Sequence, residues 1–260
     1  MHRHPPSSPL FNRCPQINIQ AACLATRLRP TPNPLARHCQ KQLEAYPDWR
    51  SLYADPRLPF HLDLGCGKGH LVYHLACEHP EMNFLGLELQ EERVKPFPAL
   101  PNLAYVCCNV NVSLEPLLKS YASHAVATAT AMTVKRVSIL YPDPWFKKRH
   151  AKRRMVTPEL VRTIHGFLDD GPDSEVYLET DFGEGFFEAK DIFLRDSFVL
   201  ETDEKHFPPC RFGMSEFAMW VREDPSIRIF TATFRKVPRN ATQCEEATTP
   251  PPHPNSVPPA

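Results

Sequence analysis

Apolar runs alternate with amphipathic stretches between residues 60 and 237, and this alternation limits the fold more than any other feature. Runs such as NFLGLEL (83–89) and VSILY (137–141) are apolar over nearly their whole length. Continuous apolarity of this kind is typical of strands that are covered on both faces. Amphipathic stretches between them, such as HLVYHLACEH (70–79), indicate helices. The pattern therefore predicts an α/β domain built on a mostly parallel sheet with helices on both faces.

Further elements follow from the same pattern. Strands are expected at residues 60–65, 103–109, 174–181, 198–202 and 227–237. Helices are expected at 157–168, where Thr157 provides a cap and Pro158 occupies the first turn, and at 183–196. Residues 120–134 are rich in Ala and Thr and are interpreted as a variable insertion.

The two ends of the chain differ in composition from the middle. No acidic residue precedes Glu44, whereas several arginines do, a bias that fits an organelle transit peptide. We therefore expect residues 1–26 to form a leader and suspect a chloroplast or other organelle. Serine is sparse, so a cytoplasmic location is the alternative. Residues 27–237 would form the folded domain, and the Pro-rich residues 238–260 a disordered tail.

Overall composition excludes several classes of protein. The chain has 30 basic and 30 acidic residues, so nucleic-acid binding would have to depend on local clusters of charge. Its nine cysteines form no C-x-x-C pair, which favours buried reduced thiols over disulfides or a zinc site, and we expect no metal. No apolar run approaches the length of a membrane span, so we expect no membrane association.

A glycine loop, DLGCGKGH, follows the first expected strand and precedes a helix. Gly65, Gly67 and Gly69 would let the backbone turn tightly and approach a ligand near the helix N-terminus. The spacing is not that of a dinucleotide fingerprint, because His70 stands where the third glycine would be, and no P-loop Lys-Ser/Thr follows. The loop therefore suits a ligand that lacks a pyrophosphate, although a plain tight turn is the alternative.

Polar residues stand at the ends of three successive expected strands. Glu88 lies about 20 residues after the glycines, where an acid can accept hydrogen bonds from two ribose hydroxyls. Asp63 could hold an ammonium group, and Asn109 could contact an adenine edge. Together they describe a nucleoside that carries an amino acid, and S-adenosylmethionine fits this description. Each residue taken alone could equally be a helix cap or a surface polar group.

The stretch LYPDPWFKKRHAKRRM (140–155) combines one acid with a dense block of positive charge. Asp143 lies between two prolines, which restrict its backbone, at the same carboxyl edge of the predicted sheet. Six cations follow without an acid among them: Lys147, Lys148, Arg149, Lys152, Arg153 and Arg154. This block could bind phosphates, whereas a solvated loop or a localisation signal is the alternative interpretation.

The segment YPDPWFKKRHAKRRMVTPEL resembles the signature of the tRNA (guanine-N7)-methyltransferases, which methylate the variable-loop guanine at position 46. DLGCGKGH, FLGLEL, NLAYVCCN and LETD occur in the family's order, and NPLARHCQ (33–40) resembles the lead-in of cyanobacterial-type members. The resemblance covers roughly residues 27 to 237. The Pro-Asp-Pro-Trp motif with its basic block is the specific part of it.

The resemblance implies a class I methyltransferase (Rossmann-like) fold, with a mostly parallel seven-stranded sheet and an antiparallel C-terminal strand. It implies S-adenosylmethionine as cofactor, bound by Asp63, Gly65, Gly67, Glu88, Asn109 and Asp143. Contacts with tRNA are expected at Lys147, Lys148, Arg149, Arg153, Arg154, Asp181, Ser215 and Glu216. One departure is Phe217, which stands where the family usually has a basic residue.

The expected chemistry needs no general base, because guanine N7 already presents a lone pair, so catalysis would consist mainly of positioning. Asp143 would orient the guanine and favour the cationic product, and it is the predicted catalytic residue. Bacterial-type members act alone, so no obligate protein partner is expected. Two alternatives stay open: a methyltransferase for a substrate other than RNA, and a catalytically inactive tRNA-binding protein on the same fold.

Overall fold

The computed structural model describes residues 32–94, 97–127, 133–202, 224 and 226–237, and the predicted leader and tail lie outside these ranges. Seven strands form one sheet in the order β3-β2-β1-β4-β5-β7-β6. The strands are β1 (Phe60–Leu64), β2 (Asn83–Glu88), β3 (Leu103–Cys107), β4 (Val134–Leu140), β5 (Glu175–Thr180), β6 (Phe198–Thr202) and β7 (Phe230–Lys236).

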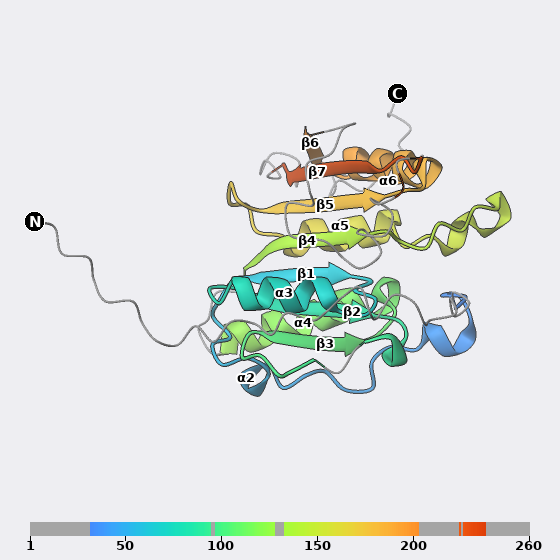
Figure 1. Ribbon diagram of the computed structural model, residues 1–260. Helices are drawn as coiled ribbons and strands as arrows, with labels where there is room; N and C mark the ends of the chain where they lie inside the picture. Colours follow the sequence, from blue (N-terminus) through green and yellow to red (C-terminus); the bar gives the residue numbers. More distant parts are fainter. Residues whose placement is uncertain (1–31, 95–96, 128–132, 203–223, 225, 238–260) are drawn as a thin grey trace, which may run out of the picture.

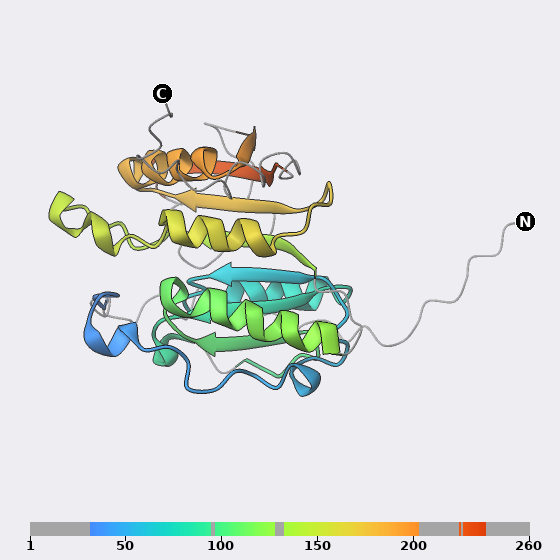
Figure 2. The same ribbon diagram turned by 180° about the vertical axis from the view of Figure 1, so that it is seen from behind.

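The longer helices cover both faces of this sheet (Figures 1 and 2). They are α3 (His70–Glu78), α4 (Val110–Ala127), α5 (Pro158–Phe167) and α6 (Gly183–Arg195). Helix α3 lies on one face, and α4, α5 and α6 lie on the other. Shorter elements are η1 (Arg37–Gln40), α2 (Trp49–Leu52), η2 (Glu91–Arg93) and η3 (Lys148–Arg153).

Strand β1 pairs in parallel with β2 on one side and with β4 on the other. Strands β3 and β5 extend this parallel arrangement, whereas β7 pairs antiparallel with both β5 and β6. The sheet thus has the class I methyltransferase arrangement, and the predicted fold class is confirmed. The carboxyl ends of the five parallel strands meet at one edge, to the right in Figure 1.

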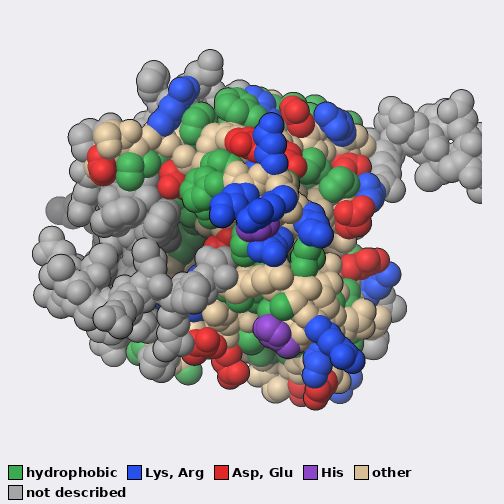
Figure 3. All heavy atoms as spheres, turned by 90° about the vertical axis from the view of Figure 1, so that its right-hand side faces the viewer, with side chains coloured by type: hydrophobic (Ala, Val, Ile, Leu, Met, Phe, Trp, Pro, Cys, Tyr) green, Lys and Arg blue, Asp and Glu red, His purple; other side chains and the backbone are tan. Residues whose placement is uncertain are grey.

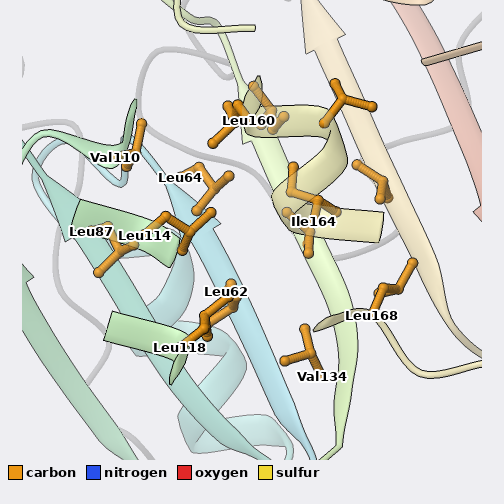
Figure 4. Close-up of a cluster of buried hydrophobic side chains, with 14 of the residues drawn as sticks. Leu62, Leu64, Leu87, Val110, Leu114, Leu118, Val134, Leu160, Ile164 and Leu168 are labelled. Carbon is orange, nitrogen blue, oxygen red and sulfur yellow. The ribbon is translucent and has the colours of Figure 1, made fainter. Parts of the chain in front are cut away.

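The main hydrophobic core lies between the sheet and helices α4, α5 and α6. Leu62 and Leu64 of β1 point toward Leu114 and Leu118 of α4 in Figure 4. Helix α5 begins as the sequence predicts, because the Thr157 side chain accepts a hydrogen bond from the backbone of the first turn. A smaller cluster packs α3 against the opposite face of the sheet.

Helix α4 corrects the interpretation of residues 120–134 as an insertion. Residues 120–127 are the last turns of this 18-residue helix, and 128–132 lie outside the described residues. Buried side chains recur along one face of the helix at helical spacing: Val110, Leu114, Leu117, Leu118, Tyr121 and Ala125. Pro116 lies inside the helix, and proline is usually a helix breaker, so the local signal was weak.

Strand β4 begins at Val134, three residues earlier than the sequence pattern predicted. The extra residues include Lys135 and Arg136, whose charges are compensated by ion pairs with Asp169 and Glu175. Paired charges at the start of a strand therefore hid its true beginning.

Among the described residues, no helix has the length and apolarity needed to cross a membrane.

We expect Leu117→Ala to lower the free energy of unfolding by about 2–5 kcal/mol, because the side chain is fully buried and its loss leaves a cavity. Urea unfolding followed by circular dichroism would measure the change. Leu194→Ala is the matched control, since Leu194 is 42% exposed and its truncation should cost well under half as much. Equal losses in the two variants would contradict the assignment of α4 to the core.

Candidate active site

A crevice opens at the carboxyl edge of the parallel strands and encloses about 650 Å³, part of it open to solvent. We call it the first crevice. Four of the six predicted cofactor residues line it: Gly65, Glu88, Asn109 and Asp143. Its other lining residues are Pro34, Leu87, Leu89, Arg93, Cys108, Val110, Asn111, Tyr141, Pro142, Arg153 and Met155.

The glycine loop forms one wall of the first crevice. Gly65 and Gly67 have positive φ angles of 83° and 56°, which L side chains rarely adopt. A Cβ atom on Gly65 would also lie 2.8 Å from Cε of Met155. The backbone N–H groups of Gly65 and Cys66 both donate to the carbonyl of Leu87, at 2.8 and 2.9 Å, and so tie the loop to β2.

Glu88 ends β2 and is held in place by backbone donors. Its two carboxylate oxygens accept hydrogen bonds from the N–H groups of Gly67 and Gln90, each at 3.0 Å. Burial raises its pKa, and the Asp143 carboxylate nearby adds to this effect. Each oxygen keeps a free lone pair, so the fixed carboxylate can accept hydrogen bonds from a diol.

Asp63 is the residue before the last of β1, close to the glycine loop, and is only 3% exposed. Ser138 Oγ donates a hydrogen bond of 2.7 Å to its Oδ1. Burial raises the pKa of Asp63 to about 6, and the Glu88 carboxylate also favours protonation. Asp63 is not among the residues that line the first crevice, so its contact with an ammonium group stays a prediction.

Asn109 lines the first crevice, but its side-chain amide is already engaged. The Nδ2 group donates to the carbonyls of Pro34 and Cys39, each at 3.0 Å, and so anchors the lead-in segment around η1. Its Oδ1 accepts from the backbone N–H of Asn111 at 3.1 Å. The predicted contact of this side chain with an adenine would therefore compete with its structural role. Asn109 also holds Pro34 in place, and both residues line the first crevice.

The segment around Asp143 has an unusual backbone. Tyr141 and Trp145, on either side of Pro-Asp-Pro, have φ angles of 48° and 41°, which are rare for bulky residues and cost about 1–3 kcal/mol each. Contacts with Glu179 of β5 hold Tyr141: its N–H donates to the Glu179 carbonyl and its hydroxyl to Oε1, both at 2.7 Å. Oε2 of this buried carboxylate accepts from the Tyr177 hydroxyl at 2.6 Å.

A second crevice of about 380 Å³ lies on the other side of this segment. It shares Pro142, Asp143 and Met155 with the first crevice, so these residues form the partition between the two. The other residues that line the second crevice are Pro144, Arg154, Val156, Leu178, Thr180, Phe182, Gly185, Glu188 and Ala189. Asp181 itself is exposed, although its neighbours Thr180 and Phe182 line this crevice.

The basic block folds as the 3-10 helix η3 on the same edge, where Lys and Arg side chains gather near the middle of the face in Figure 3. Lys147, Lys148, Arg149 and Lys152 are exposed, and no acid within the described part of the chain pairs with them. Arg153 is different, because its guanidinium stacks 4.8 Å from the ring centre of Trp145.

Arg154 also departs from the predicted role of an RNA contact. It forms ion pairs with Glu184 and Glu188 of α6, and its guanidinium lies 5.1 Å from the ring centre of Phe182. Its charge is thus already compensated, and it anchors η3 to α6. The predicted substrate residues Ser215 and Glu216, like Phe217, lie outside the described residues.

Comparisons with known proteins identify the family to which the chain belongs. Residues 57–217 match the family model described as "Putative methyltransferase". The tRNA (guanine-N(7)-)-methyltransferase of Synechococcus elongatus is 43% identical over 161 residues, which cover 60% of this chain and 70% of that protein. The protein of the same name from Microcystis aeruginosa is 39% identical over 204 residues, covering 76% and 85% respectively. The chain belongs to the tRNA (guanine-N(7)-)-methyltransferase family.

Among solved structures, the 16S rRNA methyltransferase KamB aligns with a TM-score of 0.46 and 14% identity, over 76% of this chain and 98% of that one.

Three buried polar residues that the sequence analysis did not single out support the candidate site. Ser138 donates a hydrogen bond to Asp63, His61 contacts Ser138, and Glu179 supports Tyr141. A signal was present for the first two, because both are polar residues inside strands that are otherwise buried. His61 and Ser138 contact each other across two strands, so only the pairing of β1 with β4 shows what they contact.

Asp63 gives a pH-dependent prediction. Its pKa of about 6 in the folded protein exceeds the ordinary value of 3.8, so its contribution to stability is full below about pH 4 and is lost as the pH rises through 6. We therefore expect Asp63→Asn, which cannot ionise, to be more stable than the wild type by about 1–3 kcal/mol near pH 7.5, with little difference near pH 4. Urea unfolding across this pH range would measure it.

Asp191→Asn serves as the control for that series, because Asp191 is 66% exposed. Its effect on stability should stay within about 0.5 kcal/mol at every pH. A gap between Asp63→Asn and the wild type that does not widen with pH would show that Asp63 does not titrate as described.

Proposed function

We propose that this protein methylates N7 of guanine 46 in the variable loop of tRNA, with S-adenosylmethionine as methyl donor. The observation that carries the proposal is the position of Asp143, which borders two crevices at the carboxyl edge of the sheet. A methyl transfer needs two molecules brought together at one point, and a shared partition between two crevices supplies such a point.

The first crevice suits the cofactor. When bound, S-adenosylmethionine supplies an electrophilic methyl group on a sulfonium ion. Glu88 is fixed by two backbone N–H groups and can accept the ribose hydroxyls. Leu87, Leu89 and Cys108 offer apolar surface for a flat base. The acids Asp63, Glu88 and Asp143 make this part of the protein favourable for positively charged groups.

The second crevice would take the target base. Phe182 gives it an aromatic side, Leu178 and Val156 give apolar walls, and Asp143 provides an acceptor at its boundary. Single RNA bases are commonly recognised by stacking on aromatic side chains together with hydrogen bonds to their edges. Asp143 can accept from the N–H groups of guanine and stabilise the positive charge that the purine gains on methylation.

The exposed cations of η3 lie on the same edge as both crevices. Cations without acid partners attract a phosphate backbone, and their contribution depends strongly on salt. RNA with a defined fold would then be held mainly through its shape and its phosphates, while the crevices select the base.

The test is transfer of labelled methyl from S-adenosylmethionine to an unmodified tRNA transcript, beside a transcript with guanine 46 replaced. Label should enter only the first and be recovered as 7-methylguanosine. Asp143→Asn should reduce this rate by about 100-fold or more, because a charge at the reacting centre is lost. Folded protein that binds tRNA without transferring label would favour a catalytically inactive tRNA-binding protein. Label that enters a protein or a small molecule instead would favour a methyltransferase for a substrate other than RNA.

The basic block gives a separate prediction. Lys148→Gln should weaken tRNA binding and reduce the slope of log affinity against log salt concentration by about 1. Filter binding over a series of KCl concentrations would measure the slope. Arg50→Gln is the matched control, because Arg50 is exposed on α2, away from the carboxyl edge (Figure 1), and should leave the slope unchanged. Equal slopes for wild type and Lys148→Gln would remove this residue from the RNA interface.

A further inference from the structure

Hydrogen bonds connect three buried polar side chains of β1 and β4, and one of them, Asp63, lies two residues before Gly65, which lines the first crevice. Ser138 Oγ lies 2.7 Å from Asp63 Oδ1 and 2.9 Å from His61 Nε2. The strand register places Ser138 of β4 beside Asp63 of β1, and His61 lies two residues earlier on the same face of β1. The exposed fractions are 1% for His61, 0% for Ser138 and 3% for Asp63, so water does not compete for these hydrogen bonds.

The direction of the hydrogen bonds follows from the number of hydrogens. A serine hydroxyl has one hydrogen, and an ionised carboxylate can only accept, so Ser138 donates to Asp63. The alternative acceptor, the Leu62 carbonyl, lies 3.5 Å away and is a much weaker partner. His61 must then donate its Nε2–H to Ser138. Burial lowers the pKa of His61 to about 3, so the ring is neutral and keeps this single tautomer.

The surroundings of Asp63 explain why such support is needed. Glu88 from β2, Cys66 from the glycine loop and Tyr105 from β3 interact with it electrostatically, and none of them carries positive charge. Within the described part of the chain, no Lys or Arg forms an ion pair with Asp63. The Ser138 hydroxyl is the group that favours its ionised form. A buried carboxylate without a cation of its own, next to a ligand crevice, can be matched by a cation on the ligand.

We propose that Ser138, oriented by His61, is a positioning residue that keeps Asp63 ionised and correctly placed for the ammonium group of the cofactor's amino acid. This inference rests on the proposed function for the identity of the ligand. It assigns to Ser138 and His61 a role in cofactor recognition, although neither residue lines the first crevice.

Two ligands separate this role from a general structural one. S-adenosylhomocysteine carries the ammonium group, whereas 5′-methylthioadenosine has the same nucleoside and no amino acid. Ser138→Ala should bind S-adenosylhomocysteine at least fivefold more weakly near pH 7 and bind 5′-methylthioadenosine as the wild type does. Isothermal titration calorimetry would measure both affinities. In methylation assays, KM for S-adenosylmethionine should rise while kcat stays nearly unchanged.

The pH profile provides an independent readout. Loss of the donor to the ionised form raises the pKa of Asp63, so S-adenosylhomocysteine affinity should appear at higher pH in Ser138→Ala than in the wild type. Ser138→Cys, which keeps a weaker donor, should fall between the two. If Ser138→Ala proves unstable, the comparison of Ser138→Cys with the wild type still tests the inference.

Ser113→Ala is the matched control. Ser113 is also fully buried, but its hydroxyl has no hydrogen-bond partner among the described residues, so both ligands should bind as in the wild type. Equal weakening of both ligands in Ser138→Ala, or unchanged S-adenosylhomocysteine affinity and pH profile, would overturn the inference while tRNA methylation by the wild type stands. Wild-type protein that binds neither ligand would overturn the proposed function itself.

Discussion

The parallel pairing of β1 with both β2 and β4 is the constraint on which the rest of the site depends. Parallel strands end at the same edge, so this pairing gathers Asp63, Glu88 and the segment around Asp143, which are far apart in the sequence. The glycine loop then closes against β2 through two hydrogen bonds to the Leu87 carbonyl. The crevice is thus a consequence of strand order, as expected for α/β sheets that bind ligands at their carboxyl edge.

Charge is distributed in two layers around this edge. Buried acids lie inside, and burial raises the pKa of both Asp63 and Glu88. A cation or a pair of hydroxyl groups that enters the crevice can therefore interact with these carboxylates. The exposed cations of η3 lie outside on the same edge. A small cationic nucleoside and a large polyanion can therefore be held at the same time without competing for the same charges.

Identifiable contacts hold the partition between the two crevices in place. Two prolines flank Asp143, and Tyr141 and Trp145 adopt positive φ angles that bulky residues avoid. Glu179 holds Tyr141 through backbone and side chain, and Arg153 stacks on Trp145. Arg154 adds the ion pairs to α6 that anchor the following turn. Strain at this point persists because the surrounding contacts fix it, which is the arrangement expected where a carboxylate must keep one position.

Much of the fold was predictable because its signals are local. Buried strands are apolar over their length, and Thr157 with Pro158 marks the start of α5, so these elements were found within a few residues of their bounds. Helix α4 was not predicted, because Pro116 disfavours helix formation locally. Packing of the apolar face of α4 against the sheet overrides that preference.

The sequence by itself determined which strands carry an acid near their carboxyl ends, where the glycines turn the chain and where positive charge is concentrated. Only the tertiary structure decided which of these groups are already occupied. Asn109 is engaged by the lead-in segment, Arg154 by two acids of α6, and Asp63 by Ser138. The physical reason is that a residue's type and its immediate neighbours fix its chemistry, whereas its partners come from segments that meet only when strands pair and helices pack.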